Sequence, residues 1–269
     1  SGPSQHHERM WKRVQAVIKM DAPAPVSKCL GCTHIFESVK LPNGQPAQKV
    51  TWDMTDFMEQ CVTSYRELCV NLYKQEPTLK TVTTPFLNED LLDKDQDMGG
   101  PGILHAIACS VLMKVLCGAR LARVDLLRAV SHLAQSVSKW TRKHDRMLHR
   151  RMCYINSTKS MPMSGILGDD LGQLELRLFS DADFAGDKDS SKSTTGIYLA
   201  LHGPNTHFPL AATSAKQTHV SHSTPEAEIV ALNAAVRKMG MPAMTFWDTL
   251  KGRPMRLRFM EDNVPLIHI

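Results

Sequence analysis

The stretch LELRLFSDADFAGDKDSSKSTTG, residues 174–196, places a cluster of acidic residues directly after an alternating segment. Its first six residues alternate between apolar and polar side chains, which predicts a half-buried β-strand. Four aspartates follow within nine residues, namely Asp181, Asp183, Asp187 and Asp189. Such a cluster is either a solvated turn or part of a metal site. Which of the two it is depends on whether other carboxylates arrive at the same place.

The residues after this cluster predict a β-β-β-α-β order together with the first strand. GIYLALHG (196–203) and THFPLAATS (206–214) have the composition of strands, and a Gly/Pro/Asn turn joins them. STPEAEIVALNAAVRKMG (223–240) begins with Ser/Thr and has a proline near its first turn, which is typical of a helix N-terminus. PMRLRFMEDN (254–263) predicts the last strand. Upstream of the cluster, the sequence predicts a strand over 29–41 and a helix over 50–73, where the apolar spacing between residues 54 and 72 is helical. Further helices are expected over 103–118, 123–140 and 142–158.

Three carboxylates are expected to converge in this arrangement. A right-handed crossover would pair the last strand in parallel with the first, so that Asp181 and Asp262 end at the same sheet edge. The helix residues expected to face the sheet are Ile229, Leu232, Ala235 and Val236. Glu228 adjoins this stripe and would point towards both aspartates. Carboxylate oxygens suit Mg²⁺ or Mn²⁺, and two such ions commonly serve phosphodiester hydrolysis.

Two other metal sites fit the sequence less well. Residues 181–192 match an EF-hand loop at positions 1, 3 and 6, but Ala185 and Lys192 occupy positions 5 and 12, and position 12 requires a bidentate glutamate. Cys29, Cys32 and His34 could begin a zinc site, but no second ligand pair follows at a suitable spacing.

Three ordered motifs carry a resemblance to a known family. SDADFAGDKDSSKSTTG (180–196), SAKQTHVSHSTPEAEIVAL (214–232) and MEDNVPLIHI (260–269) together resemble the ribonuclease H domain of copia-type retrotransposon Pol polyproteins. Upstream, residues 103–155 are similar to the family's connection region, with RVDL in place of its RPDI element. The resemblance implies an α/β, ribonuclease H-like fold, truncated at its C-terminus and preceded by a mainly helical thumb or connection-like region.

The resemblance also implies a division of the chain into four parts. Residues 1–48 would be the end of a reverse-transcriptase palm-like segment, and residues 49–160 the helical thumb or connection-like region. Residues 161–173 would be a linker. Residues 174–269 would be the ribonuclease H-like domain. Because both ends of the chain look cut, we expect it to be a piece of a longer polypeptide.

The catalytic residues implied by the resemblance are Asp181, Glu228 and Asp262, which would also be the ligands of two Mg²⁺ or Mn²⁺ ions. The three later aspartates of the cluster are expected mainly to shape and solvate the turn after Asp181. The implied reaction is metal-dependent hydrolysis of the RNA strand of an RNA–DNA hybrid. The family's fourth carboxylate lies in a later helix, which this chain does not reach, and its polymerase active site would lie upstream of residue 1. We interpret GDD at 168–170 as an acidic turn in the linker rather than as part of that polymerase site.

The overall charge is compatible with a polyanionic partner. Lys+Arg number 32 against 27 Asp+Glu, and the pI is about 8.8. The candidate phosphate contacts are Lys139, Arg142, Lys143, Arg146, Arg150, Arg151, Lys192 and Lys216. The expected partners are an RNA–DNA hybrid or duplex and the remainder of the Pol polyprotein. No apolar run is long enough for a membrane span, and seven cysteines without a compact framework favour an intracellular compartment.

Two alternatives compete with an active nuclease. One is a decayed element that binds nucleic acid without cleaving it, which the missing fourth carboxylate and the altered RPDI element favour. The other is a transposase or integrase, which shares the fold and the metal chemistry. Those enzymes carry Asp, Asp and Glu in chain order, whereas the order here is Asp, Glu, Asp.

Overall fold

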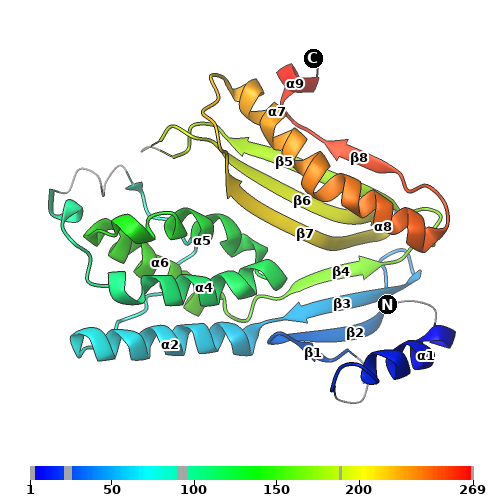
Figure 1. Cartoon of the computed structure of the whole chain (residues 1–269), viewed down its shortest axis with the longest axis horizontal. Coiled ribbons are helices and arrows are strands. Elements are labelled where there is room, and N and C mark those ends of the chain that lie inside the picture. The colour runs from blue at the N-terminus through cyan, green and yellow to red at the C-terminus, as the bar shows by residue number, and fades with distance from the viewer. Residues whose placement is uncertain (1–3, 21–25, 90–91, 93–95, 188–189, 268–269) are drawn as a thin grey trace.

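The computed structural model describes residues 4–20, 26–89, 92, 96–187 and 190–267. Asp189, which was expected to shape the acidic turn, lies outside this part of the chain. Over the described residues the protein is a mixed α/β structure around one eight-stranded sheet, whose strand order is β1-β2-β3-β4-β7-β6-β5-β8. Figure 1 shows helices α2, α4, α5 and α6 gathered at one end of the sheet, while α7 and α8 cross one face of its C-terminal half.

The first half of the sheet is an antiparallel hairpin extended by one strand on each side. Its strands are β1 (Lys28–Cys29), β2 (Cys32–Lys40), β3 (Pro46–Asp53) and β4 (Met163–Leu167). The sequence predicted β2 but assigned the end of β3 to the following helix. Strand β4 lies within residues 161–173, which were expected to be a linker, and it pairs antiparallel with β3. The segment therefore joins the two halves of the sheet as a strand.

The helical part has its own apolar core. Its elements are α2 (Thr55–Tyr73), η1 (Gln96–Gly99), α4 (His105–Leu121), η2 (Val124–Leu126), α5 (Leu127–Ala134), η3 (Val137–Lys139) and α6 (Arg142–Thr158). Met58, Leu112, Leu133 and Met152 are buried among them. The sequence predicted α2, α4 and α6, whereas the segment 123–140, which was expected to be one helix, is divided into η2, α5 and η3. Helix α1 (Ser4–Gln15) precedes the first strand in the chain.

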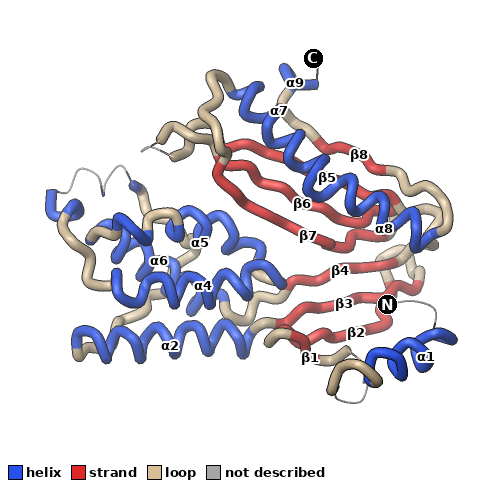
Figure 2. Tube along the Cα trace, viewed as in Figure 1, coloured by secondary structure: helices blue, strands red, loops and turns tan. Residues whose placement is uncertain are grey.

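The C-terminal half confirms the expected order of elements (Figure 2). Three antiparallel neighbours come first, namely β5 (Glu175–Asp183), β6 (Thr194–Gly203) and β7 (Thr206–Lys216). They are followed by α7 (Thr224–Ala235), η4 (Val236–Gly240), α8 (Met241–Lys251), β8 (Leu257–Met260) and α9 (Val264–Ile267). Strand β8 pairs in parallel with β5, from Leu176↔Leu257 to Phe179↔Met260. The crossover expected from the sequence is therefore present.

The crossover helix is longer than expected because Gly240 does not end it. A Cβ atom at Gly240 would lie 3.0 Å from the Leu178 side chain and 3.1 Å from that of Leu257. The glycine thus allows the helical segment to lie close to the sheet, and the chain continues through a π-helical turn into α8. No helix among the described residues has the length and apolar character needed to cross a membrane.

The face of α7 that meets the sheet differs from the predicted one. Ile229 is 42% exposed, although it was expected to face the sheet, whereas Ala227, Ala231 and Ala235 are fully buried. Of the predicted stripe, Ala235 is therefore correct and Ile229 is wrong, while Leu232 and Val236 are half-buried. Small alanine side chains let a helix approach a sheet closely. Because the alanine face of α7 meets the sheet in place of the predicted stripe, Glu228 lies on the buried side of the helix.

Candidate functional site

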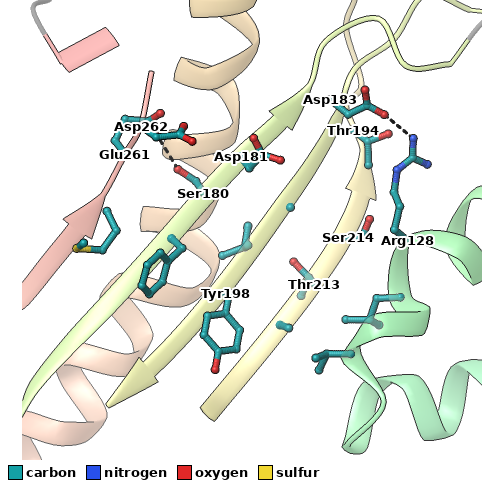
Figure 3. Close-up of a pocket in the computed structure, with 17 residues that line it drawn as sticks. Arg128, Ser180, Asp181, Asp183, Thr194, Tyr198, Thr213, Ser214, Glu261 and Asp262 are labelled. Atoms are coloured by element: carbon teal, nitrogen blue, oxygen red, sulfur yellow. Dashed lines mark hydrogen bonds and ion pairs between the residues drawn. The ribbon is translucent and has the colours of Figure 1, made fainter. Parts of the chain in front are cut away.

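The parallel pairing of β5 with β8 brings the ends of these strands together (Figure 3). Because Phe179 pairs with Met260, Asp181 and Asp262 lie just beyond the last paired residues. Both aspartates are exposed and line one cavity of about 690 Å³. The Ser180 hydroxyl donates to Glu261 Oε2 at 3.5 Å across the two strands. Two of the three predicted site residues therefore face the same cavity.

Glu228 approaches the same place from the helix side. Its side chain is on the buried face of α7, only 4% exposed, and its Oε2 has no hydrogen-bond partner among the described residues. Burial, followed by the negative charges of Asp181, Glu261 and Asp262, raises the pKa of Glu228 to about 7, although the backbone N–H of Ala182 opposes this shift. The three predicted carboxylates are therefore close enough to influence one another electrostatically.

The chemistry of this donor set fits a divalent cation. Carboxylate oxygens are the ligands that Mg²⁺ and Mn²⁺ prefer, and the unpartnered buried oxygen of Glu228 lacks the compensation that a polar atom normally needs. In the described part of the chain, however, no group of three or more His, Cys, Asp or Glu residues is arranged to hold a metal ion.

The raised pKa of Glu228 predicts how metal-free stability depends on pH. In the presence of a chelator, the folded protein retains this proton up to about pH 7, whereas the unfolded chain releases it near 4.5. Stability should therefore fall as the pH rises between these values, by roughly 3 kcal/mol at most. Urea unfolding should be measured from about pH 5 to pH 8. In Glu228→Gln, the fall in unfolding free energy that comes from Glu228 should be absent.

The matched control for this experiment is Glu226→Gln, which changes an exposed glutamate two residues away on the same helix. This variant should keep the pH dependence of the wild type. Parallel pH profiles for the wild type and Glu228→Gln would contradict the assignment of a buried, protonated Glu228.

The other described aspartates of the cluster hold the turn. Asp183 accepts from Arg128 at 2.6 Å, which connects α5 to the sheet, and Asp187 accepts from Lys216 at 2.6 Å. Although burial opposes ionisation, hydrogen bonds from Lys216 and Ser190 lower the pKa of Asp187 to about 2. These contacts agree with the prediction that the later aspartates shape the turn after Asp181.

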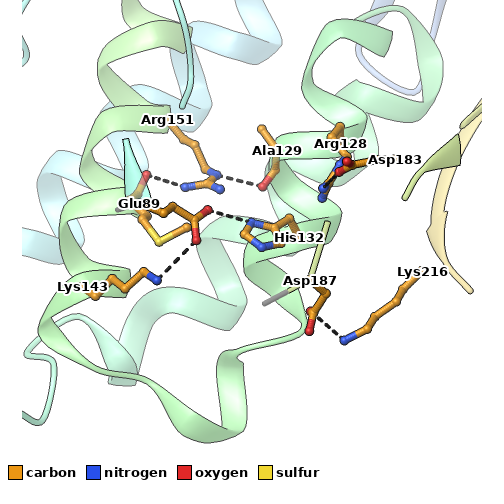
Figure 4. Close-up of polar contacts among 10 residues, drawn as sticks. Glu89, Arg128, Ala129, His132, Lys143, Arg151, Asp183, Asp187 and Lys216 are labelled. Carbon is orange, nitrogen blue, oxygen red and sulfur yellow. Dashed lines mark hydrogen bonds and ion pairs between the residues drawn. The ribbon is translucent and has the colours of Figure 1, made fainter. Parts of the chain in front are cut away.

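One of the predicted basic residues, Arg151, lies inside the helical part (Figure 4). Arg151 is 2% exposed, and its guanidinium donates to the carbonyls of Ala129 and Met147 at 2.8 and 2.9 Å inside the helical part. Because α6 turns this side chain towards α5, Arg151 cannot reach a phosphate. We therefore remove it from the predicted contacts.

The remaining basic residues differ in how available they are. Lys139, Arg142 and Arg146 are exposed. Lys143 pairs with Glu89 at 3.3 Å, and Arg150 donates to the carbonyl of Thr84 at 2.8 Å. Lys192 is half-buried, and Lys216 is held by Asp187.

Sequence reasoning did not assign a role to Glu261. Its carboxylate accepts from Ser180 and from the backbone N–H of Asn263, and its charge acts on Glu228. Its position next to Asp262, at the end of a strand, was the available signal. Glu261, which directly follows β8, is therefore a fourth acidic residue near the three predicted carboxylates.

Three named proteins are similar to this chain in sequence. Retrovirus-related Pol polyprotein from transposon RE1 of Arabidopsis thaliana is 33% identical over 160 residues, which cover 56% of this chain and 10% of that protein. The corresponding protein from transposon RE2 is 39% identical over 106 residues, or 39% of this chain and 7% of that protein. Secreted RxLR effector protein 161 of Plasmopara viticola is 34% identical over 116 residues, or 43% of this chain and 77% of that protein.

The chain thus spans a tenth or less of the two polyproteins that it matches. No protein-family model matches the chain. No solved structure matches it either.

Proposed function

We propose that this chain, which is similar in sequence to two retrovirus-related Pol polyproteins, is a ribonuclease H-like segment that hydrolyses the RNA strand of RNA–DNA hybrids. One observation carries the proposal. Glu228, buried beneath the strand ends and with an unpartnered carboxylate oxygen, lies within electrostatic reach of Asp181 and Asp262. The pairing of β8 in parallel with β5, after a crossover helix, supports a ribonuclease H-like fold.

Asp181, Glu228 and Asp262 would hold two Mg²⁺ or Mn²⁺ ions. When bound, such ions activate an attacking water and stabilise the leaving 3′ oxygen. Asp181 and Asp262 are exposed, so they would lie on the side of the site that faces the substrate. Glu228 would lose its proton when it binds a metal ion. The hydrogen bond from Ser180 to Glu261 would keep the ends of β5 and β8 in register.

Recognition of a hybrid should depend on shape more than on sequence. The deep major groove of an A-like helix hides its bases, so a protein reads 2′-hydroxyls and phosphates across the wide minor groove. Binding should therefore weaken as salt increases. Exposed Lys139, Arg142 and Arg146 remain candidates for phosphate contacts, with Lys143, Arg150, Lys192 and Lys216 less available. The remainder of the Pol polyprotein would be the protein partner.

A second candidate is a remnant that binds nucleic acid without cleaving it. The described carboxylates form no group arranged to hold a metal ion, which favours this alternative. A related sequence also occurs in a protein named as a secreted effector, so this segment is not confined to proteins named Pol polyprotein.

A cleavage assay separates the two candidates. The purified chain should shorten the labelled RNA strand of a hybrid in Mg²⁺ or Mn²⁺, leave the DNA strand intact, and lose this activity when a chelator removes the metal. The matched substrate is a DNA duplex of the same sequence, which should not be cut. Salt-sensitive binding of the hybrid without cleavage in either metal would contradict the proposal and favour the remnant.

A further inference from the structure

A second basic segment lies at the opposite end of β8 from the carboxylates. KGRPMRLR, residues 251–258, connects the end of α8 to β8 and carries four cations in eight residues. Arg253, Arg256 and Arg258 are exposed, and Lys251 is half-buried. Arg177, which pairs with Arg258 in the sheet register, adds a fifth cation from β5.

Few carboxylates balance this charge. Glu175 pairs with Arg177 at 2.9 Å and with Arg258 at 3.2 Å. Burial opposes its ionisation, but the hydrogen bond from Arg177 and the charges of Arg258 and Arg256 lower its pKa, so this carboxylate is ionised. Asp248 accepts from the backbone N–H of Met255 at 2.6 Å. Among the described residues of this cluster, two carboxylates therefore face five cations.

The cluster surrounds a polar hollow rather than a flat surface. Lys251, Arg253 and Arg256 line one cavity of about 340 Å³, together with Gln173 and the carboxylate of Glu175. The guanidinium of Arg253 lies next to Gly172, since a Cβ atom at Gly172 would be 2.9 Å from Nη2 of Arg253. Three cations and one carboxylate therefore share this concave site.

Strand β8 leads from this site towards the carboxylates. Side chains two residues apart along a strand share a face, so Arg258 lies on the same face of β8 as Met260. Met260 and Asp262 line the larger cavity, together with Asp181. Arg256 and Asp262 are six positions apart in the sequence, which sets an upper limit of about 20 Å on their separation at about 3.3 Å per residue. A single duplex is long enough to reach both sites.

We propose that Lys251, Arg253 and Arg256 bind backbone phosphates of the duplex whose RNA strand is cleaved at the carboxylates. The inference rests on the proposed function for the position of the substrate. Arginine forks match phosphate oxygens, and a surplus of positive charge next to a concave polar surface favours a polyanion. The cluster would therefore hold the duplex at a point away from the cleaved bond.

The test compares two double variants by fluorescence anisotropy with a labelled 18-base-pair RNA–DNA hybrid in chelator. Arg253→Ala/Arg256→Ala should weaken binding about tenfold near 0.1 M salt and lower the slope of log affinity against log salt by about 2. Arg237→Ala/Lys238→Ala removes two exposed cations from η4 and should leave affinity within about twofold. Thermal unfolding of both variants establishes that they fold.

Three outcomes would overturn the inference. Unchanged affinity and salt slope for the Arg253/Arg256 variant is the first, and an equal loss in the Arg237/Lys238 variant is the second. The third is competition by poly-glutamate as effective as competition by unlabelled hybrid, because the cluster would then be a site for acidic protein. Cleavage by the wild type in Mg²⁺, measured in parallel, reports on the proposed function separately.

Discussion

Replacing Asp181 by asparagine should reduce cleavage of the RNA strand about a thousandfold, which corresponds to about 4 kcal/mol of transition-state stabilisation. The substitution preserves the size of the side chain but removes the charge that a divalent cation needs. Because Asp181 is exposed at the end of β5, the fold should not change. Single-turnover cleavage in Mg²⁺, with hybrid binding measured alongside, checks this result.

A second readout separates loss of the metal site from unfolding. Asp181 is one of the charges that raise the pKa of Glu228, so Asp181→Asn should lower that pKa towards its ordinary value. The metal-free stability of the variant should therefore depend less steeply on pH than that of the wild type.

Asp170→Asn is the matched control for Asp181→Asn. Asp170 is an exposed aspartate in the turn before β5, within the GDD sequence that we interpret as an acidic turn. Its replacement should leave cleavage within about twofold of the wild type. If Asp181→Asn retained activity within about threefold, or if Asp170→Asn removed it, the assignment of the site would be wrong.

Replacing Arg123 by alanine should lower the free energy of unfolding by about 3 kcal/mol. Arg123 is 1% exposed and belongs to the RVDL sequence between α4 and α5. Its guanidinium donates to both oxygens of Asp125, at 2.9 and 2.7 Å, and to the carbonyl and hydroxyl oxygens of Thr158, both at 2.9 Å. The substitution would leave Asp125 without its counter-ion and free the C-terminal end of α6.

Urea unfolding measures this effect, and two further variants serve as comparisons. Arg123→Lys should recover little of the loss, because an ammonium group cannot make the paired bonds of a guanidinium fork. Arg120→Ala, an exposed arginine on the last turn of α4, should change stability by less than about 0.5 kcal/mol. A loss below about 1 kcal/mol for Arg123→Ala would show that the buried contacts contribute little.

Local patterns in the sequence predicted the elements whose formation depends on local physics. The apolar spacing between residues 54 and 72 predicted α2, and the alternation of residues 174–179 predicted β5. The order of strands and helix, combined with the handedness of crossovers, predicted that β8 lies parallel to β5. That one pairing is enough to place Asp181 beside Asp262.

Other features depend on contacts between distant residues. Strand β4 is short, and its pairing with β3 involves residues more than 100 positions earlier. The rotation of α7 depends on how closely its alanines approach the sheet, which hydrophobicity alone does not encode, so Ile229 was placed on the wrong side. Arg151 lay in a basic run, but only the packing of α6 against α5 shows that its guanidinium is buried.

The junction between β4 and β7 makes the sheet continuous through very few backbone contacts. In the described strands, Ile166↔His207 is the one residue pair in their register. Side chains supplement it: the Thr206 hydroxyl accepts from the backbone N–H groups of Gly168 and Asp169, and Asp169 accepts from Asn205. Amide hydrogens along this seam should therefore exchange with solvent sooner than those between β5 and β6, so that the sheet can flex here while the carboxylates stay together.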